Sequence, residues 1–340
     1  MNDPIESASE AGLKYVSDDA PGIRRTKKGK GFTYTDDVSG PVKDERTLTR
    51  IKNLVIPPAW QDVWICKLTN GHLQVTGRDD RNRKQYRYHE KWVTNRNGSK
   101  FEKLAELAHK LPLLRKKIEE DLLLTGLPRE KVLAAVIKVM LITQSRIGNS
   151  QYADENESYG LTTILNKHAK VTGSAIKLDF KGKSGVEHDI SFSDSQLSKI
   201  IRKCQELPGE ELFAYEDDGN VIDVTSTHVN EYLKSITGED FTAKDLRTWG
   251  GTCKALEMLV NEIPEEELTE NKWKKRHLEV IKETAKFLRN TVAVCRKYYI
   301  HPVVFEADKA GKLLDIFKTC RAGKTMAREE KLLLLILDVA

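Results

Sequence analysis

The side chains of this 340-residue sequence that could do chemistry are arginines, lysines and tyrosines spread along its whole length. The first group is the segment 83–88, which alternates as a β-strand would. One face would carry Arg83, Gln85 and Arg87, and the other Lys84, Tyr86 and Tyr88. Arginine and lysine pair with phosphate, glutamine reaches base edges, and tyrosine packs on sugar or base. The segment therefore indicates nucleic-acid binding, although a solvated sheet face explains the composition equally well.

Two further cations stand where a rigid scaffold could aim them at a phosphate. Arg146 follows an apolar helix predicted over residues 130–145, and a bidentate guanidinium suits phosphate oxygens. Taken alone, an arginine that contacts the last helix carbonyls is the simpler interpretation. Lys183 lies at the tip of a hairpin predicted from strands at 174–181 and 186–192, where it could enter a groove and deliver a proton. A solvated turn lysine is the simpler alternative.

The fourth group opens a predicted helix in the C-terminal half. Lys244 and Arg247 are three residues apart and share a face of that helix, for which Thr242 is a plausible N-cap. The glycine pair 250–251 weakens a helix, so its presence early in this one indicates close packing or the approach of a ligand. An ordinary amphipathic helix start is the competing interpretation.

The fifth group runs from Asn290 to Tyr299, in a segment that reads as a helix ending before Pro302. It holds two adjacent tyrosines, Tyr298 and Tyr299, and such pairs usually divide between core and surface. The residues alone therefore favour neither tyrosine over the other.

The sequence gives no support for a nucleotide or a metal. The phosphate-loop pattern fails at Gly182-Lys183-Ser184 because position 177 is lysine rather than glycine. The eight histidines and five cysteines are scattered without a C-x-x-C pair, so no zinc site is expected. Such cysteines are typical of a reduced, cytoplasmic protein. There is no secretory signal and no apolar run of about 18 residues, so no membrane association is expected.

The N-terminal part of the chain predicts strands and turns. Residues 1–20 are polar and acidic and predict a mobile segment, and the basic, glycine-rich segment 24–31 suits a loop near phosphate. Strand signals then dominate from Phe32 to about Val93, with a hairpin at 64–77 around Asn70-Gly71. The hydrophobic share of 39% suffices for one large or two modest cores, and the net charge of +5 is mild.

From about Phe101 helical periodicity takes over, so a domain boundary and hinge are expected between Asn95 and Lys100. Further helices are expected at 194–206, 226–236, 242–260, 265–290 and 306–320, and a short buried one at 332–337. The predicted fold class is α+β. A β-rich N-terminal domain covers residues 21–97, and a mainly α-helical C-terminal domain covers residues 98–340.

Together the five groups resemble the type IB DNA topoisomerases, in the compact form found in poxviruses and bacteria. The resemblance runs from about Pro21 to the C-terminus and is densest at 56–60, 83–86, 146–161, 166–168, 244–250 and 296–302. It implies the catalytic fold that these enzymes share with tyrosine recombinases. It further implies two lobes that close around double-stranded DNA, in a nucleoid-associated monomer that needs no cofactor, nucleotide or metal.

The resemblance also implies the catalytic roles. Tyr299 would be the nucleophile that forms a 3′-phosphotyrosyl bond, because the family's tyrosine lies nine positions after the residue that matches Asn290. Arg146 and Arg247 would clamp the non-bridging phosphate oxygens, and Lys183 would protonate the departing 5′-oxygen.

Asn290 is the departure from the poxviral and eukaryotic pattern, which has histidine there; asparagine resembles the bacterial members. Lys244 and Tyr152 match DNA-contacting positions, as do the polar and aromatic residues of segment 83–88. A tyrosine recombinase is the nearest alternative, but recombinases usually carry histidine at the position of Lys244 and lack a β-rich N-terminal half. A DNA-binding protein with a decayed active site is the other, and competent residues at all five catalytic positions argue against it.

Overall fold

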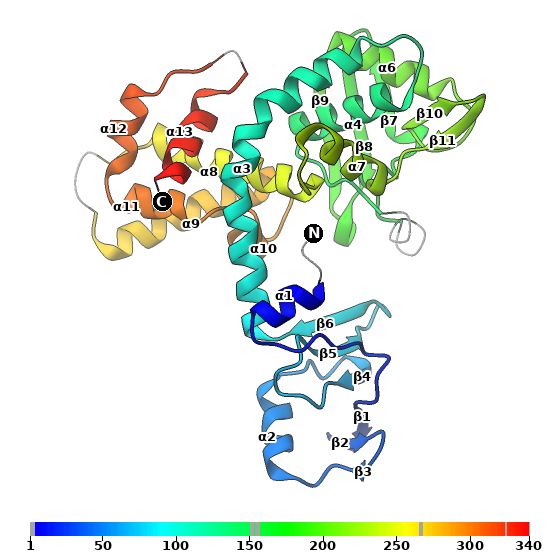
Figure 1. Ribbon diagram of the computed structural model, residues 1–340, viewed down its shortest axis with the longest axis vertical. Coiled ribbons are helices and arrows are strands. Elements are labelled where there is room, and N and C mark those ends of the chain that lie inside the picture. Colours follow the sequence, from blue (N-terminus) through cyan, green and yellow to red (C-terminus); the bar gives the residue numbers. More distant parts are fainter. Residues whose placement is uncertain (1–3, 150–152, 154–156, 265–267, 324, 340) are drawn as a thin grey trace. The chain divides into compact units, whose positions relative to one another are not determined.

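The chain divides into two compact units, Met1–Lys100 (unit 1) and Phe101–Ala340 (unit 2), each with its own apolar core. A computed structural model of the chain describes residues 4–149, 153, 157–264, 268–323 and 325–339, and for residues 96–100 the backbone only (Figure 1). None of the helices in these ranges combines the length and the apolar character that a membrane span requires.

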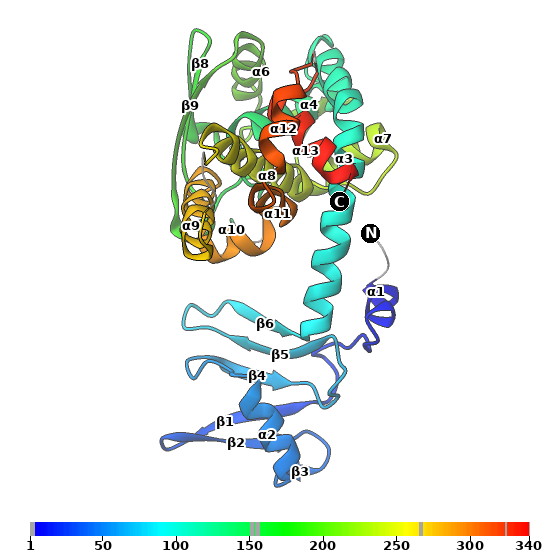
Figure 2. The ribbon, with the colours of Figure 1, turned by 90° about the vertical axis from the view of Figure 1, so that its left-hand side faces the viewer.

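Unit 1 is built on a six-stranded antiparallel sheet with the strand order β3-β2-β1-β4-β5-β6. The strands are β1 (Ile23–Lys28), β2 (Gly31–Asp36), β3 (Gly40–Pro41), β4 (Gln61–Ile65), β5 (Leu73–Arg78) and β6 (Lys84–Tyr88). Helix α2 (Glu45–Asn53) packs on this sheet through Ile51, which meets Val63 and Val75 in the core (Figure 2). The predicted β-rich character of the N-terminal region is confirmed, and α2 was not predicted.

Segment 24–31, expected as a loop, is mostly strand. It forms the hairpin of β1 and β2, whose cross-strand pairs run from Ile23–Asp36 to Lys28–Gly31. The Arg25 guanidinium donates to the carbonyls of Pro57, at 3.0 Å, and Trp60, at 2.6 Å. Arg25 therefore provides hydrogen-bond donors for main-chain carbonyls of the irregular segment 57–60. Composition alone does not reveal this structural role.

The linker expected at 95–100 is helical rather than irregular, because α3 (Glu90–Leu122) continues through it. A single glycine lowers helix stability by about 1 kcal/mol, and the stretch contains no proline to block the helix. The helix is long, and Leu104, Leu107, Leu111, Leu114 and Leu122 on one side of it are buried, whereas Leu113 is exposed. Residues 4–20, predicted as mobile, carry α1 (Pro4–Glu10), and Ala8 and Leu13 are buried with Trp92.

Unit 2 is mainly helical, as predicted, and carries small antiparallel sheets. Its helices are α4 (Arg129–Thr143), α6 (Ser195–Gln205), α7 (Ser226–Thr237), α8 (Ala243–Asn261), α9 (Glu270–Phe287), α10 (Val292–Tyr298), α11 (Val303–Lys309), α12 (Lys312–Thr319) and α13 (Arg328–Asp338). The predicted helix 306–320 is two helices, because Gly311 adopts a left-handed φ of 68° between them. Residues 265–267 of the predicted helix 265–290 lie outside the described ranges.

The predicted Lys183 hairpin is present as β8 (Ala175–Lys181) and β9 (Glu187–Ser193), joined by a short 3-10 turn at Lys183–Gly185. Sequence reasoning missed β7 (Ala169–Thr172), which adds a third strand beside β8. It also missed a separate hairpin of β10 (Ala214–Asp217) and β11 (Asn220–Asp223). Helix α6 packs along β7 and β8 (Figure 1).

Helix α8 is the centre of unit 2, in contact with α4, α7, α9, α11 and α13. Its Trp249 is buried and donates to a Glu330 carboxylate oxygen at 3.1 Å. Both oxygens of Glu330 also accept from the Arg115 guanidinium of α3, at 2.8 and 2.6 Å. The C-terminal helix α13, predicted from the apolar tail, is thereby fixed to the helices on which the candidate site is built.

Gly251 of α8 provides a direct test of this packing. A Cβ at this position would lie 2.6 Å from the Tyr299 carbonyl oxygen, so Gly251→Ala must push α8 away from the end of α10. We expect the variant to lower the free energy of unfolding by roughly 1–2 kcal/mol in urea titrations, although alanine favours helix. Gly31→Ala is the control, since its Cβ would meet nothing closer than 4.0 Å. Equal stability of the two variants would contradict the close approach.

Candidate active site

Arg146 lies just beyond α4, in a segment that the fold holds tightly. Gln144 ends the helix in a left-handed conformation with φ 52°, and Ser145 is fully buried. The Arg146 carbonyl then accepts from the Leu161 amide at 2.9 Å. The backbone of Arg146 is therefore fixed on both sides, and its side chain leaves a rigid base.

Arg247 reaches the same region from α8. Thr242 is the N-cap of this helix, as predicted, and its amide donates to the Asp245 carboxylate at 2.9 Å. Arg247 lies about one turn further on and is only 3% exposed. Its Nη2 donates to the Leu288 carbonyl at 2.9 Å, at the end of α9. Burying a guanidinium this deeply is unfavourable unless hydrogen bonds or an opposite charge compensate it, so such arginines are rare in protein interiors.

Asn290 joins the two arginines through the turn that follows α9. Its main-chain amide donates a hydrogen bond to the Ala285 carbonyl at 2.8 Å, just beyond the C-terminal end of α9. Its side-chain Oδ1 accepts a hydrogen bond from Arg146 Nη2. Leu288 and Asn290 of this one turn thus anchor Arg247 and Arg146, respectively.

Tyr299 caps the short helix α10 and faces the arginines. Its amide donates to Cys295 at 2.9 Å, and its carbonyl accepts from the Thr252 hydroxyl of α8 at 3.4 Å. The Arg247 guanidinium carbon lies 5.2 Å from the centre of the Tyr299 ring. The close approach expected at the glycine pair 250–251 is confirmed, because Gly251 packs against this tyrosine's carbonyl.

Tyr298 has different neighbours. The ammonium groups of Lys244 and Lys297 lie 6.0 and 5.3 Å from the centre of its ring. Lys244 is exposed at the first turn of α8. The structure therefore separates the two adjacent tyrosines, with Tyr299 against the buried guanidinium and Tyr298 between lysines.

Three donors of the site have no acceptor within the described residues. They are Arg146 Nη1, Arg247 Nε and Asn290 Nδ2, and all three atoms are buried. A buried donor without a partner is disfavoured by about 1–3 kcal/mol, and more where the group is charged. Since the three come from separate elements, an anion with several oxygens would satisfy them together, and a phosphodiester has that form.

The electrostatics of the pocket point the same way. Burial lowers the pKa of Arg247 to about 10, and it also lowers the pKa of Arg146. Interaction with Tyr299 opposes both shifts. The charge of Arg146 adds to the lowering of the Arg247 pKa. Both arginines remain charged at neutral pH, so a bound anion would relieve an unfavourable concentration of positive charge.

His188 is a residue of this region that sequence reasoning missed. It lies on the inner face of β9, is 2% exposed and stacks on Phe180 with ring centres 4.6 Å apart. Burial, followed by the charges of Arg289, Arg146 and Arg247, lowers its pKa to about 4. Its alternation with Ile190 along the predicted strand was the available signal.

Lys183 lies at the exposed tip of the β8–β9 hairpin, as predicted. The preceding Gly182 packs on His188 so closely that a Cβ there would lie 2.5 Å from the imidazole Nε2. The buried imidazole therefore connects the lysine turn to the region of the arginines.

Across the ranges that the structure covers, no group of three His, Cys, Asp or Glu side chains could hold a metal ion.

The predicted DNA-contacting strand is β6 of unit 1, and its faces alternate as expected. Tyr86 and Tyr88 are 47% and 44% exposed, with stacked rings 6.0 Å apart. On the other face, Arg83 and Gln85 both bind the Asp79 carboxylate, at 2.7 and 2.9 Å. Tyr86 and Tyr88 thus present ring surface to solvent, whereas Arg83 and Gln85 are held by Asp79. Tyr152, the remaining predicted DNA contact, lies outside the described residues.

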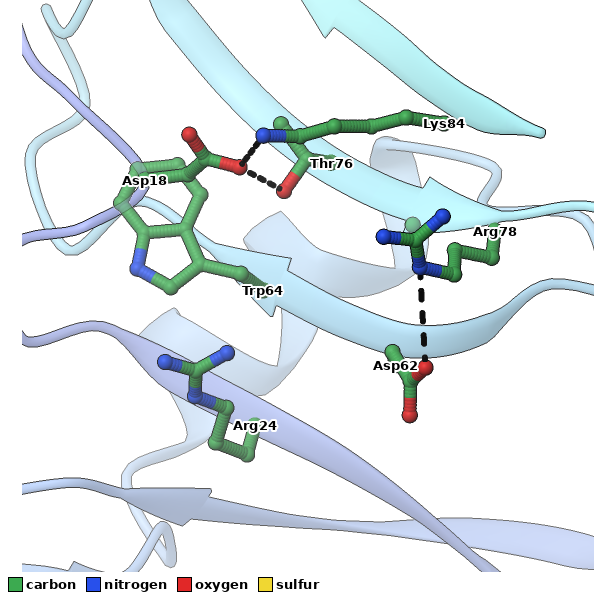
Figure 3. Close-up of a pocket in the computed structure, with 8 residues that line it drawn as sticks. Asp18, Arg24, Asp62, Trp64, Thr76, Arg78 and Lys84 are labelled. Atoms are coloured by element: carbon green, nitrogen blue, oxygen red, sulfur yellow. Dashed lines mark hydrogen bonds and ion pairs between the residues drawn. The ribbon is translucent and has the colours of Figure 1, made fainter. Parts of the chain in front are cut away.

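Lys84 lines a pocket of about 170 Å³ in unit 1 (Figure 3). Its ammonium lies 2.7 Å from the Asp18 carboxylate, which also accepts from the Thr76 hydroxyl at 2.9 Å. Burial raises the pKa of Asp18, but the hydrogen bonds from Lys84 and Thr76 outweigh it and keep this pKa below its usual value. A phosphate that engaged Lys84 would therefore compete with Asp18.

The known proteins to which this chain is similar are DNA topoisomerases. Residues 85–321 match the family model of the eukaryotic DNA topoisomerase I catalytic core, and residues 31–79 match that of the bacterial DNA topoisomerase IB N-terminal domain. DNA topoisomerase 1B of Acanthamoeba polyphaga mimivirus is 31% identical over 82% of this chain and 85% of its own length. DNA topoisomerase 1B of Vaccinia virus (strain Copenhagen) is 25% identical, over 85% of this chain and 91% of its own.

The pKa of His188 gives a test of the pocket that needs no substrate. Its value in the folded protein, about 4, lies below the ordinary 6.5, so the unfolded chain binds the proton first as the pH falls. Between pH 7 and pH 5, the wild type should lose about 2 kcal/mol more unfolding free energy than His188→Gln. His89→Gln, which makes the same change at a partly exposed histidine of unit 1, serves as the control. Parallel pH profiles of wild type and His188→Gln would refute a buried, neutral imidazole.

Proposed function

This chain belongs to the type IB DNA topoisomerase family, and from that premise we propose that Tyr299 is the nucleophile with which it cleaves and rejoins DNA. The enzyme acts on DNA as a topoisomerase. The proposal concerns how its own residues carry out the reaction: one strand of a duplex is cut, the free end rotates, and the strand is sealed again.

Cleavage exchanges one phosphodiester for another. The Tyr299 hydroxyl oxygen attacks the phosphorus and loses its proton to solvent, while the bond from phosphorus to the 5′-oxygen breaks. The departing 5′-oxygen takes a proton from Lys183. The products are a 3′-phosphotyrosyl bond and a 5′-hydroxyl strand, and resealing reverses each step.

The observation that carries this proposal is the set of buried donors beside Tyr299. Arg146 Nη1, Arg247 Nε and Asn290 Nδ2 have no acceptor among the residues that the structure describes, and Arg247 lies 5.2 Å from the tyrosine ring. The pentacoordinate transition state carries more negative charge on its non-bridging oxygens than the ground state does. Fixed cationic donors therefore stabilise the transition state preferentially, which is what lowers the barrier.

A general acid is needed because an unprotonated 5′-alkoxide is a poor leaving group. Lys183 is proposed for this step, with a contribution on the order of 10²–10⁴ in rate. The buried ring of His188 packs against Gly182, the residue before Lys183. The charges of Arg146 and Arg247 help to lower the pKa of this ring, so we propose that the lysine turn lies near them. Since the hairpin tip is exposed, the lysine can move into a bound duplex.

The proposed reaction uses neither a nucleotide nor a metal. Replacing one phosphodiester by another is nearly isoenergetic, so no ATP is required to store or reseal the bond. Positive side chains balance the charge that a metal ion would otherwise balance. We also propose that a monomer suffices, because one chain supplies all five residues, and that the enzyme works in the cytoplasm, on the nucleoid.

The proposed DNA contacts come from both units. In unit 1 they are Arg83, Lys84, Gln85, Tyr86 and Tyr88, and in unit 2 they are Tyr152 and Lys244. The exposed tyrosines of β6 are suited to sugar and base contact, and the lysines to phosphate. Residues 21–97 would then form an N-terminal DNA-binding domain, and residues 98–340 the catalytic domain. Binding should weaken steeply as salt rises.

The two competing functions are less well supported. A tyrosine recombinase would share the arginines and the nucleophile, but Lys244 and the β-rich unit 1 favour the topoisomerase, as does the family match. A binding protein with a decayed site is opposed by the geometry, because Arg146, Arg247, Asn290 and Tyr299 are assembled rather than dispersed.

Replacing the nucleophile tests the proposal. Tyr299→Phe removes the hydroxyl and keeps the ring beside Arg247, so it should abolish relaxation of a supercoiled plasmid and the covalent adduct trapped by denaturant. Binding of duplex DNA at low salt should persist within about threefold, since affinity depends mainly on phosphate contacts. The reactions contain EDTA and no ATP.

Tyr298→Phe is the matched control, as it makes the same change one residue away. It should relax plasmid at no less than about a tenth of the wild-type rate, because its ring lies between lysines rather than against the buried guanidinium. Relaxation by Tyr299→Phe, or its loss in Tyr298→Phe alone, would assign the chemistry elsewhere.

A further inference from the structure

The turn after α9 has a third residue that the proposed mechanism does not use. Leu288 accepts from Arg247 Nη2 at 2.9 Å, and Asn290 accepts from Arg146 Nη2. Arg289 lies between these two anchors. The residue that separates the contacts of both site arginines is thus itself an arginine.

Arg289 is held in an uncommon conformation. Its φ is 52°, in the left-handed region that a bulky residue rarely adopts. Its Nη1 donates to the Thr143 carbonyl at 3.2 Å, at the last residue of α4 and three residues before Arg146. Arg146 reaches from the end of α4 to the turn, and Arg289 reaches back from the turn to the end of α4. The two guanidinium groups therefore bridge the same two segments in opposite directions.

The charge of Arg289 affects the pKa values of two residues of the site. It is the largest charge effect on His188, ahead of Arg146 and Arg247, and with burial it lowers the pKa of that imidazole. It also contributes, after burial and the interactions with Tyr299 and Arg146, to the lowered pKa of Arg247. Three guanidinium groups consequently act on one partly buried region, in which Coulomb interactions are stronger than in water.

We infer that Arg289 supplies a third positive charge to the scissile phosphate, and that this charge complements the neutral amide of Asn290. Asn290 Nδ2 can donate a hydrogen bond to a phosphate oxygen but carries no charge. Arg289, next to it in the chain, provides the charge without taking the amide's place. This inference rests on the proposed function, because it concerns the same phosphate.

A purely structural role is the competing explanation. Arg289 could simply hold the ends of α4 and α9 together through the carbonyls of Thr143 and Phe287. That role predicts loss of stability and makes no reference to charge at position 290. The two explanations therefore differ in what a cation introduced at position 290 would do.

A double-mutant cycle tests the inference. Arg289→Gly removes the side chain and suits the left-handed backbone, and Asn290→His introduces an imidazole that can carry a proton at its neighbour. The measurement is the single-turnover rate of covalent adduct formation on supercoiled plasmid, with enzyme in excess, at pH 6. Thermal unfolding of each variant is followed in parallel.

We expect Arg289→Gly to slow adduct formation by about tenfold to hundredfold, while Arg289→Lys retains most of the rate. Asn290→His should raise the rate of the Arg289→Gly enzyme at least about fivefold more than it raises that of the Arg289-containing enzyme, since only the former lacks the charge. Lys286→Ala is the matched control, because it removes an exposed cation three residues earlier on α9. It should stay within about twofold of wild type.

The inference is overturned if Arg289→Gly reacts at the wild-type rate. It is equally overturned if Arg289→Lys is as slow as Arg289→Gly, or if Asn290→His changes the rate in both backgrounds by the same factor. A wild-type enzyme that forms no adduct would instead reject the proposed function, and the inference with it. If the wild type forms the adduct normally but the effects of Arg289→Gly and Asn290→His are additive, only the role of Arg289 is rejected, and the proposed function stands.

Discussion

The interaction on which the catalytic unit depends is the burial of guanidinium groups whose donors are only partly used by the protein. Arg247 is 3% exposed and gives Nη2 to the Leu288 carbonyl, while its Nε has no acceptor within the described part of the chain. Taking such a charge from water is unfavourable by several kcal/mol unless an anion compensates it. In this fold the charge is nevertheless buried, and it is held between α8 and the end of α9. That is the arrangement expected where an enzyme stabilises negative charge that develops on a phosphate.

The rest of unit 2 follows from holding that charge in place. Helix α8 carries Arg247 on one turn and Gly251 and Thr252 on the next, and those two residues receive the backbone of Tyr299. One helix therefore sets both the cation and the proposed nucleophile. The turn after α9 fixes the guanidinium groups from the other side. Catalysis by this family needs little covalent chemistry from the protein beyond the tyrosine, so positioning of this kind is the main contribution of the fold.

Much of this could be predicted from the sequence, and the failures have physical causes. Apolar residues at helical spacing predicted α4, which is buried on almost all sides. The set of Arg146, Lys183, Arg247 and Tyr299 was predicted through the resemblance to the type IB topoisomerases, because each residue taken alone had a simpler explanation. Composition failed at Arg25, whose partners are carbonyls about 30 residues away, and near residue 98, where one glycine does not break a long helix. His188 and the turn at Arg289 were missed because their significance lies in contacts between distant segments.

Tyr299 is proposed to join the 3′ end of a cut strand, and the site of covalent attachment can be mapped. The wild-type enzyme is reacted with supercoiled plasmid, trapped with denaturant, and digested with nuclease and protease. The modified peptide is then sequenced by mass spectrometry. We expect a nucleotide on the hydroxyl of Tyr299, attached through its 3′-phosphate, with a free 5′-hydroxyl on the other end of the break. A nucleotide on Tyr298 or any other residue, or attachment through a 5′-phosphate, would contradict it.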